Sequence, residues 1–231
     1  MKPKYRSSIP KTAREWVVDR YADGTKAKAE YQVRGKLVGV RFFHETGEAS
    51  FETPLKDGVY QGTVYRWDMP GVLLSSEPYR NGLPHGLARQ WSEGGELIGS
   101  YEMRRGTGID LWWSSCYGGF GLSEVHYMKD GDRHGFEWWL NGDTTLFEER
   151  HCLNGKLHGI EREWNSEGRL RRGYPRYYVH GEWVTKRQYL KACATDPTLP
   201  KFREADNKPK RQFPPEVAKH FHGPGEPGVN K

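Results

Sequence analysis

The stretch Asn154–Leu170 reads NGKLHGIEREWNSEGRL, and the earlier stretch Asn81–Leu97 reads NGLPHGLARQWSEGGEL. The two share Asn, Gly, His, Gly, Arg, Trp, Gly and Leu at matching places. A pattern that recurs within one chain indicates a fold assembled from repeated supersecondary units, each too small to bury its own apolar face.

Further copies are marked by a glycine that precedes each aromatic segment. These key glycines recur at intervals of 22 to 27 residues: Gly39, Gly62, Gly86, Gly108, Gly135, Gly159 and Gly181. The first and last of them lead the least regular copies, as is expected of the terminal units of a repeat array.

Within each copy the residues alternate. Counted from the key glycine, offsets 1, 3 and 5 carry large side chains, whereas offsets 2 and 4 are more often polar or charged. Period two predicts a strand with one buried face. A glycine-containing turn and a second strand follow, and an Asn-Gly or Asp-Gly pair leads to the next copy, so each copy predicts a β-hairpin. The tryptophans at offset 5 are expected to form a buried stripe: Trp67, Trp91, Trp113 and Trp164.

The predicted fold is all-β: about six to seven stacked hairpins forming one long twisted antiparallel sheet over residues 15–183. Residues 184–200 predict a short helical cap, begun by Thr185, with Tyr189, Leu190 and Cys193 on its apolar face. Residues 1–14 are expected to be a flexible basic tail with nothing to bury. Residues 201–231 are expected to be a Pro-rich charged tail, partly disordered and most so at its end.

The pattern of Asn154–Leu170 resembles the shorter bacterial form of the MORN repeat, found in proteins often grouped as YwqK-type antitoxins. The resemblance covers roughly residues 35–183 and implies a MORN-like solenoid of stacked hairpins. Proteins with such repeats include scaffolds, proposed phosphoinositide binders and accessory domains of enzymes. The antitoxin label implies binding and neutralising a partner protein, which here would be a toxin. The resemblance thus favours a protein–protein interaction module of the antitoxin, immunity or scaffold type.

Composition narrows the class of protein. The net charge is +6, but the first 14 residues hold five basic and no acidic residues, and residues 184–231 hold ten basic and five acidic ones. The repeats between them are therefore net acidic, which makes nucleic-acid binding through the repeats unlikely. No apolar run approaches the ~20 residues of a membrane span, and no signal peptide is visible. Three scattered cysteines are expected to be reduced thiols, so a cytoplasmic protein is predicted.

Histidines precede several key glycines, as at His85, His134 and His158. Stacked hairpins could align them along one edge, where they are weak candidates for a metal site. However, one histidine per repeat does not supply the three or four converging ligands that zinc needs. The prediction is therefore that the chain holds neither a metal ion nor a cofactor.

Catalytic patterns are missing from the sequence. There is no G-x-S-x-G and no phosphate-binding loop, and Cys116 has no evident base beside it. The adjacent carboxylates at Glu148, Glu149, Glu161 and Glu163 are expected to be solvated strand positions. The chain is accordingly predicted not to be an enzyme.

Aromatic residues at offset 4 predict the binding surface. Phe43, Trp112 and Trp139 occupy a position where other copies carry Arg, Gln or Glu, so they should face outward. The insert SSCYGGFGLSE (residues 114–124) breaks the repeat and adds Tyr117 and Phe120. A row of exposed aromatics is typical of a protein-binding surface. Alternatively, the insert or the C-terminal tail covers these residues.

The alternative function is peripheral binding to anionic lipid through the basic ends of the chain. The residues proposed for it are Lys2, Lys4, Arg6, Lys208, Lys210 and Arg211. Such charges contribute about 1 kcal/mol each near an anionic leaflet. A homodimer through an open sheet edge is also left open by the sequence.

Overall fold

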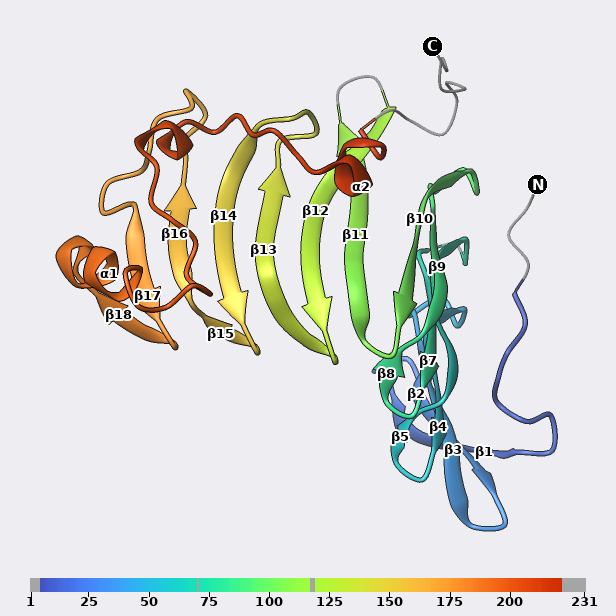
Figure 1. The fold of residues 1–231 in the computed structure, drawn as a ribbon. Coiled ribbons are helices and arrows are strands. Elements are labelled where there is room, and N and C mark those ends of the chain that lie inside the picture. The colour runs from blue at the N-terminus through green and yellow to red at the C-terminus, as the bar shows by residue number, and fades with distance from the viewer. Residues whose placement is uncertain (1–4, 70, 117–118, 222–231) are drawn as a thin grey trace. The chain divides into compact units, whose positions relative to one another are not determined.

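The computed structural model describes residues 5–69, 71–116 and 119–221, which form two compact units divided in the sequence between Gly106 and Thr107 (Figure 1). Both units are built from antiparallel hairpins in chain order, and a short helix follows the last of them. The predicted all-β class, with successive hairpins and a C-terminal helix, is confirmed. The repeat domain predicted over residues 15–183 includes strands of both units.

The first unit contains these strands: β1 (Arg14–Arg20), β2 (Lys26–Val33), β3 (Lys36–Phe43), β4 (Ala49–Lys56), β5 (Val59–Tyr60), β6 (Gly62–Trp67), β7 (Leu73–Arg80), β8 (Leu83–Pro84), β9 (Gly86–Trp91) and β10 (Leu97–Arg104). The long strands pair in chain order, β1 with β2 through to β9 with β10, and the two-residue strands β5 and β8 lie in the connections.

The second unit contains these strands: β11 (Thr107–Cys116), β12 (Gly119–Lys129), β13 (Asp132–Leu140), β14 (Leu146–Leu153), β15 (Lys156–Leu157), β16 (Gly159–Glu163), β17 (Arg176–Val179) and β18 (Glu182–Val184). They again pair in chain order. Three short helices follow: α1 (Lys186–Ala192), the 3₁₀ helix η1 (Glu204–Asn207) and α2 (Pro215–Ala218).

Tight turns at one end of the hairpins explain the Asn-Gly and Asp-Gly pairs. At seven places in the described residues a left-handed residue with φ of 50–52° precedes a glycine with φ of 76–94°. Two successive positive φ angles define the type I′ turn, whose twist matches that of the strands it joins. Asn81, Asp130 and Asn154 suit the first position of this turn, but Arg34 and Arg105 also occupy it.

A side chain from the preceding repeat caps many of these turns. The residue before the key glycine accepts the N–H of the first turn residue in the next repeat, about 20 residues on: Gln61 from Asn81, His85 from Arg105, Thr107 from Asp130 and His158 from His180, at 2.9–3.1 Å. This hydrogen bond gives His85 and His158 a structural role, which glutamine and threonine can also fill. His134 instead contacts the side chain of Asn154, with its Nδ1 3.1 Å from Oδ1.

The tryptophan stripe is confirmed, because all four of its members are buried. For Trp67, Trp91 and Trp164 the buried position is the last residue before the wider turn at the other end of the hairpin, whereas β11 continues beyond Trp113 to Cys116. Phe43 before His44 and Leu140 before Asn141 occupy it as well, and both are buried. The expectation of a single buried face is wrong for the first unit. There, Val64 and Tyr65 are neighbours in β6 on opposite faces and both are buried, while Leu87 is exposed.

Each unit is covered by its own terminal segment. Residues 5–13, the N-terminal strap, pack on β3, β4 and β6, and Ile9 is buried among Ala29, Tyr31 and Phe43. The expectation that this segment buries nothing is therefore wrong for its described part. Residues 200–221, the C-terminal strap, run across the sheet of the second unit (Figure 1). The end predicted to be disordered lies at residues 222–231, outside the described residues.

The C-terminal helix forms where the sequence predicts it. Thr185 caps α1 in a capping box with Gln188, and Tyr189 is fully buried against β16 and β17 beside Ile160 and Tyr177. Leu190, expected on the apolar face, is instead exposed.

Candidate functional site

Two of the predicted binding residues lie on one face of the second unit. Register places Trp112, Glu124 and Trp139 opposite one another on β11, β12 and β13, and the same row continues through Glu148 and Glu163. Both tryptophans are partly exposed. Strands lie ~4.8 Å apart, so the two indoles stand about 10 Å apart on alternate strands. We call these five residues the aromatic row.

A row of alternating charge runs beside the aromatic row. Its members are direct cross-strand neighbours: Asp110, His126, Glu137, Arg150, Glu161 and Arg176. We call them the charge ladder, and the face that carries both rows the ladder face. Opposite charges at directly opposed positions stabilise a sheet. Glu137 and Glu161 are buried within the ladder, so the expectation that Glu161 is a solvated position is wrong.

The surroundings of His126 within this ladder favour its charged form. Its Nδ1 lies 3.0 Å from Glu137 Oε1 and its Nε2 lies 2.9 Å from Glu124 Oε2. Both ring nitrogens face carboxylates, and both can donate only in the imidazolium form. Burial by itself lowers the pKa of His126, but the hydrogen bonds with Glu124 and Glu137 outweigh it and raise the pKa above its usual value.

The other three predicted binding residues do not join this surface. Phe43 belongs to the first unit and is only 6% exposed, because β3 has one residue fewer between its key glycine and the turn. That deletion moves Phe43 from offset 4 into the place that tryptophan occupies in other hairpins. Phe120 is exposed and pairs with Ser115, which puts it on the face opposite to Trp112. Tyr117 lies outside the described residues.

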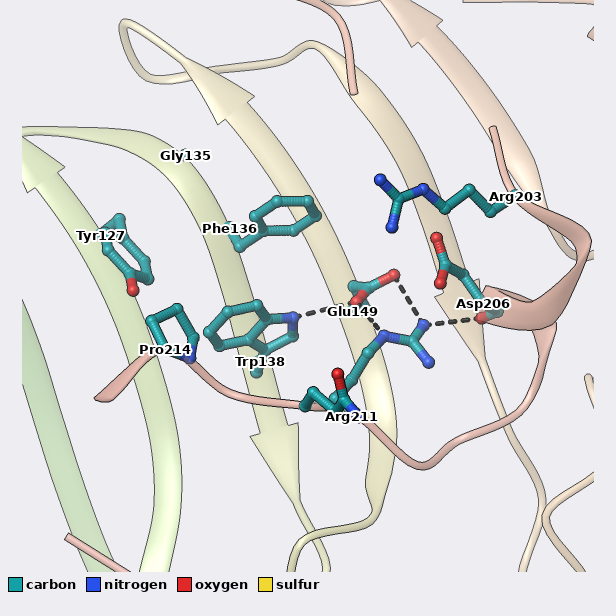
Figure 2. Close-up of a pocket in the computed structure, with 10 residues that line it drawn as sticks. Tyr127, Gly135, Phe136, Trp138, Glu149, Arg203, Asp206, Arg211 and Pro214 are labelled. Carbon is teal, nitrogen blue, oxygen red and sulfur yellow. Dashed lines mark hydrogen bonds and ion pairs between the residues drawn. The ribbon is translucent and has the colours of Figure 1, made fainter. Parts of the chain in front are cut away.

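The opposite face of this sheet is closed by the C-terminal strap around one glutamate, and we call it the strap face. Glu149 of β14 is 2% exposed. Arg211 of the strap donates from Nε and Nη2 to its two carboxylate oxygens at 2.8 and 3.0 Å. The Trp138 indole adds a hydrogen bond of 2.9 Å (Figure 2). Arg162 of β16 adds one of 2.6 Å.

These donors keep Glu149 ionised. Burial alone raises the pKa of this carboxyl, yet the hydrogen bond from Arg211 and the charges of Arg211 and Arg162 hold the pKa below its usual value. The sequence pattern was expected to leave Glu149 solvated, and that expectation is wrong. No repeat pattern marks this residue, because its partner Arg211 lies 62 residues away in a segment without period.

A cavity of about 440 Å³ lies between the strap and the strap face (Figure 2). Tyr127, Phe136 and Trp138 line its sheet side, and Pro214 lines its strap side. Arg203 and Asp206 lie at the end of the cavity beyond Glu149. Sequence reasoning did not find this site, since strand and strap residues meet only in the folded chain.

The first unit repeats the arrangement around Glu52 of β4, which is fully buried. The N-terminal strap donates hydroxyl hydrogen bonds from Tyr5 at 2.6 Å and Ser7 at 2.7 Å. Arg41 of β3 forms an ion pair with the same carboxylate at 2.5 Å. Burial and the bond to Glu52 raise the pKa of Tyr5 to about 12, so its hydroxyl remains a donor.

The histidines that precede the key glycines, His85, His134 and His158, do not converge on one metal site in the described residues. Among the described residues, one group of possible ligands converges, His158, His180 and Asp196, and neither His85 nor His134 belongs to it. His158 Nδ1 accepts the N–H of His180, so Nε2 carries the proton and donates to Thr198 Oγ1 at 2.9 Å. Only two ligands remain, fewer than a zinc site requires.

The basic residues proposed for lipid binding are dispersed. Lys2 and Lys4 lie outside the described residues, and Arg6, Lys208 and Lys210 are exposed. Arg211 is bound to Glu149 and is not available to a lipid headgroup, which is a correction to that alternative. In the described part of the chain, every helix is too short and too polar to traverse a bilayer.

Comparison with known proteins leaves the family open. No family model matches the sequence, and no curated protein matches it significantly. The repeat architecture is therefore established by the hairpins themselves.

Proposed function

We propose that this chain is a non-catalytic protein-binding module built of MORN-like hairpins, whose partner docks on the ladder face of the second unit. The observation that carries the proposal is the placement of Trp112 and Trp139 in one row of that face. The described C-terminal strap contacts the opposite face, through Trp138, Trp164 and Trp113. Of the two alternatives for the outer aromatics, this contact pattern supports a surface left open to a partner.

The surface has the composition of a protein-binding site. Two indoles supply the large apolar contacts that dominate binding energy at interfaces. Around them the ion pairs hold the long charged side chains in place, as with Arg150 between Glu148 and Glu161. Fixed side chains lose less conformational entropy when a partner binds.

The partner class follows from the resemblance to antitoxin-type repeat proteins. A neutralising module acts by surface complementarity and requires no chemistry of its own. We therefore propose that the partner is a protein whose activity is blocked while it is bound to the ladder face. A scaffold role, in which the same face binds its partner, is the other form of this function.

The experiment compares three tagged proteins: the unmodified chain, Trp112→Ala/Trp139→Ala, and Trp16→Ala as the matched control. Trp16 is an exposed tryptophan of the first unit, stacked under Arg14. Each is used to capture proteins from a lysate of the source cells, after circular dichroism has shown that the variant is folded.

The expected result is one stoichiometric protein retained by the unmodified chain and by Trp16→Ala, and lost by the double variant. Equal retention by the folded double variant would rule out the ladder face. Co-expression then separates the two forms of the function, since only an antitoxin restores growth to cells that express the captured protein.

A further inference from the structure

We propose that the cavity under the C-terminal strap binds a small carboxylate with a flat aromatic body. The site lies on the strap face of the second unit, opposite to the ladder face, and does not depend on the function proposed for that face. Its walls, its charge and one exposed arginine that makes no hydrogen bond or ion pair with a described residue point to this class of ligand.

Aromatic side chains form the sheet side of the cavity. Phe136 and Trp138 stack with their ring centroids 5.3 Å apart and an interplanar angle of 13°. Tyr127 meets Trp138 edge to face at 5.9 Å. These rings and Pro214 of the strap leave a cavity of about 440 Å³, within the range of small-molecule sites. A flat aromatic ring fits against such a wall better than a flexible chain does.

The charge beside the cavity is unbalanced. Two guanidinium groups, those of Arg211 and Arg162, share the single carboxylate of Glu149. Arg162 is 3% exposed, and its Nη2 is buried without a hydrogen-bond partner among the residues that the structure describes. Uncompensated charge in a poorly solvated site is unfavourable. A bound anion would offset this excess positive charge.

Arg203 supplies the donor that such an anion needs. Its guanidinium makes no hydrogen bond or ion pair with any described residue, although it lines the cavity. Figure 2 shows it at the same end of the cavity as Asp206 and Glu149. An arginine fork binds a carboxylate through two parallel hydrogen bonds, a geometry that lysine or a neutral donor does not reproduce.

The ligand therefore places its ring on Phe136 and Trp138 and its carboxylate on Arg203. Asp206 and Glu149 border the same space and repel any second negative charge. This pair of acids favours a monocarboxylate over phosphates and dicarboxylates.

The test uses 3-phenylpropionate as the probe and its neutral amide, 3-phenylpropanamide, as the matched ligand. Binding is measured at low salt by calorimetry and by the NMR signal of the Trp138 indole N–H, which reports on the cavity through its bond to Glu149. Arg203→Gln removes the donor. Arg172→Gln removes the same charge from an exposed position outside the cavity and is the control.

The expected result is a dissociation constant of about 1 mM or tighter for the carboxylate, in keeping with a ligand of this size. The amide and the Arg203→Gln variant should each weaken binding by about tenfold or more, and Arg172→Gln should leave it unchanged. Equal affinity for carboxylate and amide, or full affinity in folded Arg203→Gln, overturns the proposal. So does an unmoved Trp138 signal at saturating probe.

Discussion

The two units close their covered faces in the same way but with different donors. In the first unit, the buried Glu52 receives two hydroxyl hydrogen bonds from the N-terminal strap and one ion pair from Arg41. In the second, Glu149 receives guanidinium groups from both the C-terminal strap and the sheet. One carboxylate thus faces one cation in the first unit and two in the second.

The difference shows how a repeat sheet obtains a unique terminal contact. A hairpin array offers similar surfaces along its length, and a terminal segment could pack at several of them. A buried carboxylate in one strand fixes the place, because only the segment bearing the right donors satisfies it. In the first unit, the hydroxyl groups of the N-terminal strap hold the strap to Glu52 without adding charge, so Glu52 is balanced by Arg41 alone. The extra guanidinium of the second unit holds a longer strap and leaves an excess of positive charge beside a cavity.

The largest effect is expected from Glu149→Gln. Removing this charge leaves two buried guanidinium groups without a counter-ion, a change that costs about 3–5 kcal/mol. Glu52→Gln should cost less, because Arg41 is partly exposed and water can solvate it. Urea unfolding followed by fluorescence measures both, with hydrogen exchange to assign the loss to each unit.

The matched control for this pair is Glu167→Gln, an exposed glutamate paired only with Arg169 on the surface. It should change the free energy of unfolding by no more than about 0.5 kcal/mol. Equal losses in Glu52→Gln and Glu149→Gln would show that the second guanidinium adds nothing, and would remove the distinction between the two units.

The second-largest effect on stability is expected from His126 on the ladder face, and this effect depends on pH. The ladder face of the second unit contains His126 between two carboxylates, whereas the first unit has cation–aromatic pairs such as Lys28 over Phe42. Because the folded pKa of His126 is raised, its stabilisation is fully present below its unfolded pKa of about 6.5 and is lost as pH rises through the folded pKa.

His126→Gln should therefore lower the free energy of unfolding by about 2 kcal/mol at pH 6, and by less at pH 9. Unfolding at both pH values measures this difference, and an NMR titration of His126 locates the folded pKa. The neighbouring charges that face the ring are Glu124, Glu137, Asp110 and Arg133, and they must be intact in the variant. A loss that is constant with pH would mean that His126 is neutral in the fold.

A smaller effect is expected in the first unit from Tyr5→Phe. This change removes one hydroxyl donor from Glu52 while Ser7 and Arg41 remain. One hydrogen bond to a carboxylate contributes about 1–2 kcal/mol, and the partial exposure of Tyr5 favours the lower value. Hydrogen exchange in β4 measures the change. Tyr60→Phe, which alters an exposed ring in the same unit, should leave it unaltered; a similar change in both would exclude the contact with Glu52 as the cause.

Much of this fold could be predicted from the repeat. Glycines that require positive φ and the residues before the turns specify hairpins locally, so hairpins, turns and the tryptophan stripe follow from spacing. The face of Trp112 and Trp139 also follows, because both lie on regular strands. Phe43 was misplaced because residues were counted from the glycine, whereas counting back from the turn at His44 puts it in the buried stripe.

The straps could not be predicted in this way. Glu52 and Glu149 look like ordinary polar strand positions, and their partners Tyr5 and Arg211 lie 47 and 62 residues away in segments without period. Long-range pairing of this kind leaves no local pattern. The cavity, which depends on the path of the strap, is hidden from the sequence for the same reason.

The smallest effect on stability is expected from substitutions in the type I′ turns, which occur in both units. Arg34 and Arg105 adopt φ of 51° at the first position of a type I′ turn, where Asn81 and Asn154 stand in other repeats. Left-handed backbone is unfavourable for arginine and tolerated by asparagine. Arg34→Asn should therefore raise the free energy of unfolding by about 0.5 kcal/mol, since Arg34 is exposed and its side chain makes no hydrogen bond or ion pair with a described residue. The reverse change, Asn154→Arg in the second unit, should lower it by at least this amount, because it also removes the contact between Asn154 Oδ1 and His134 Nδ1 at 3.1 Å. The same urea titration measures it. If the free energy of unfolding rises in Arg34→Asn and falls in Asn154→Arg, the turns of both units follow the same backbone preference. The units then differ only in their straps and faces. If both variants change the free energy of unfolding in the same direction, tertiary contacts and not backbone preference determine the stability of these turns.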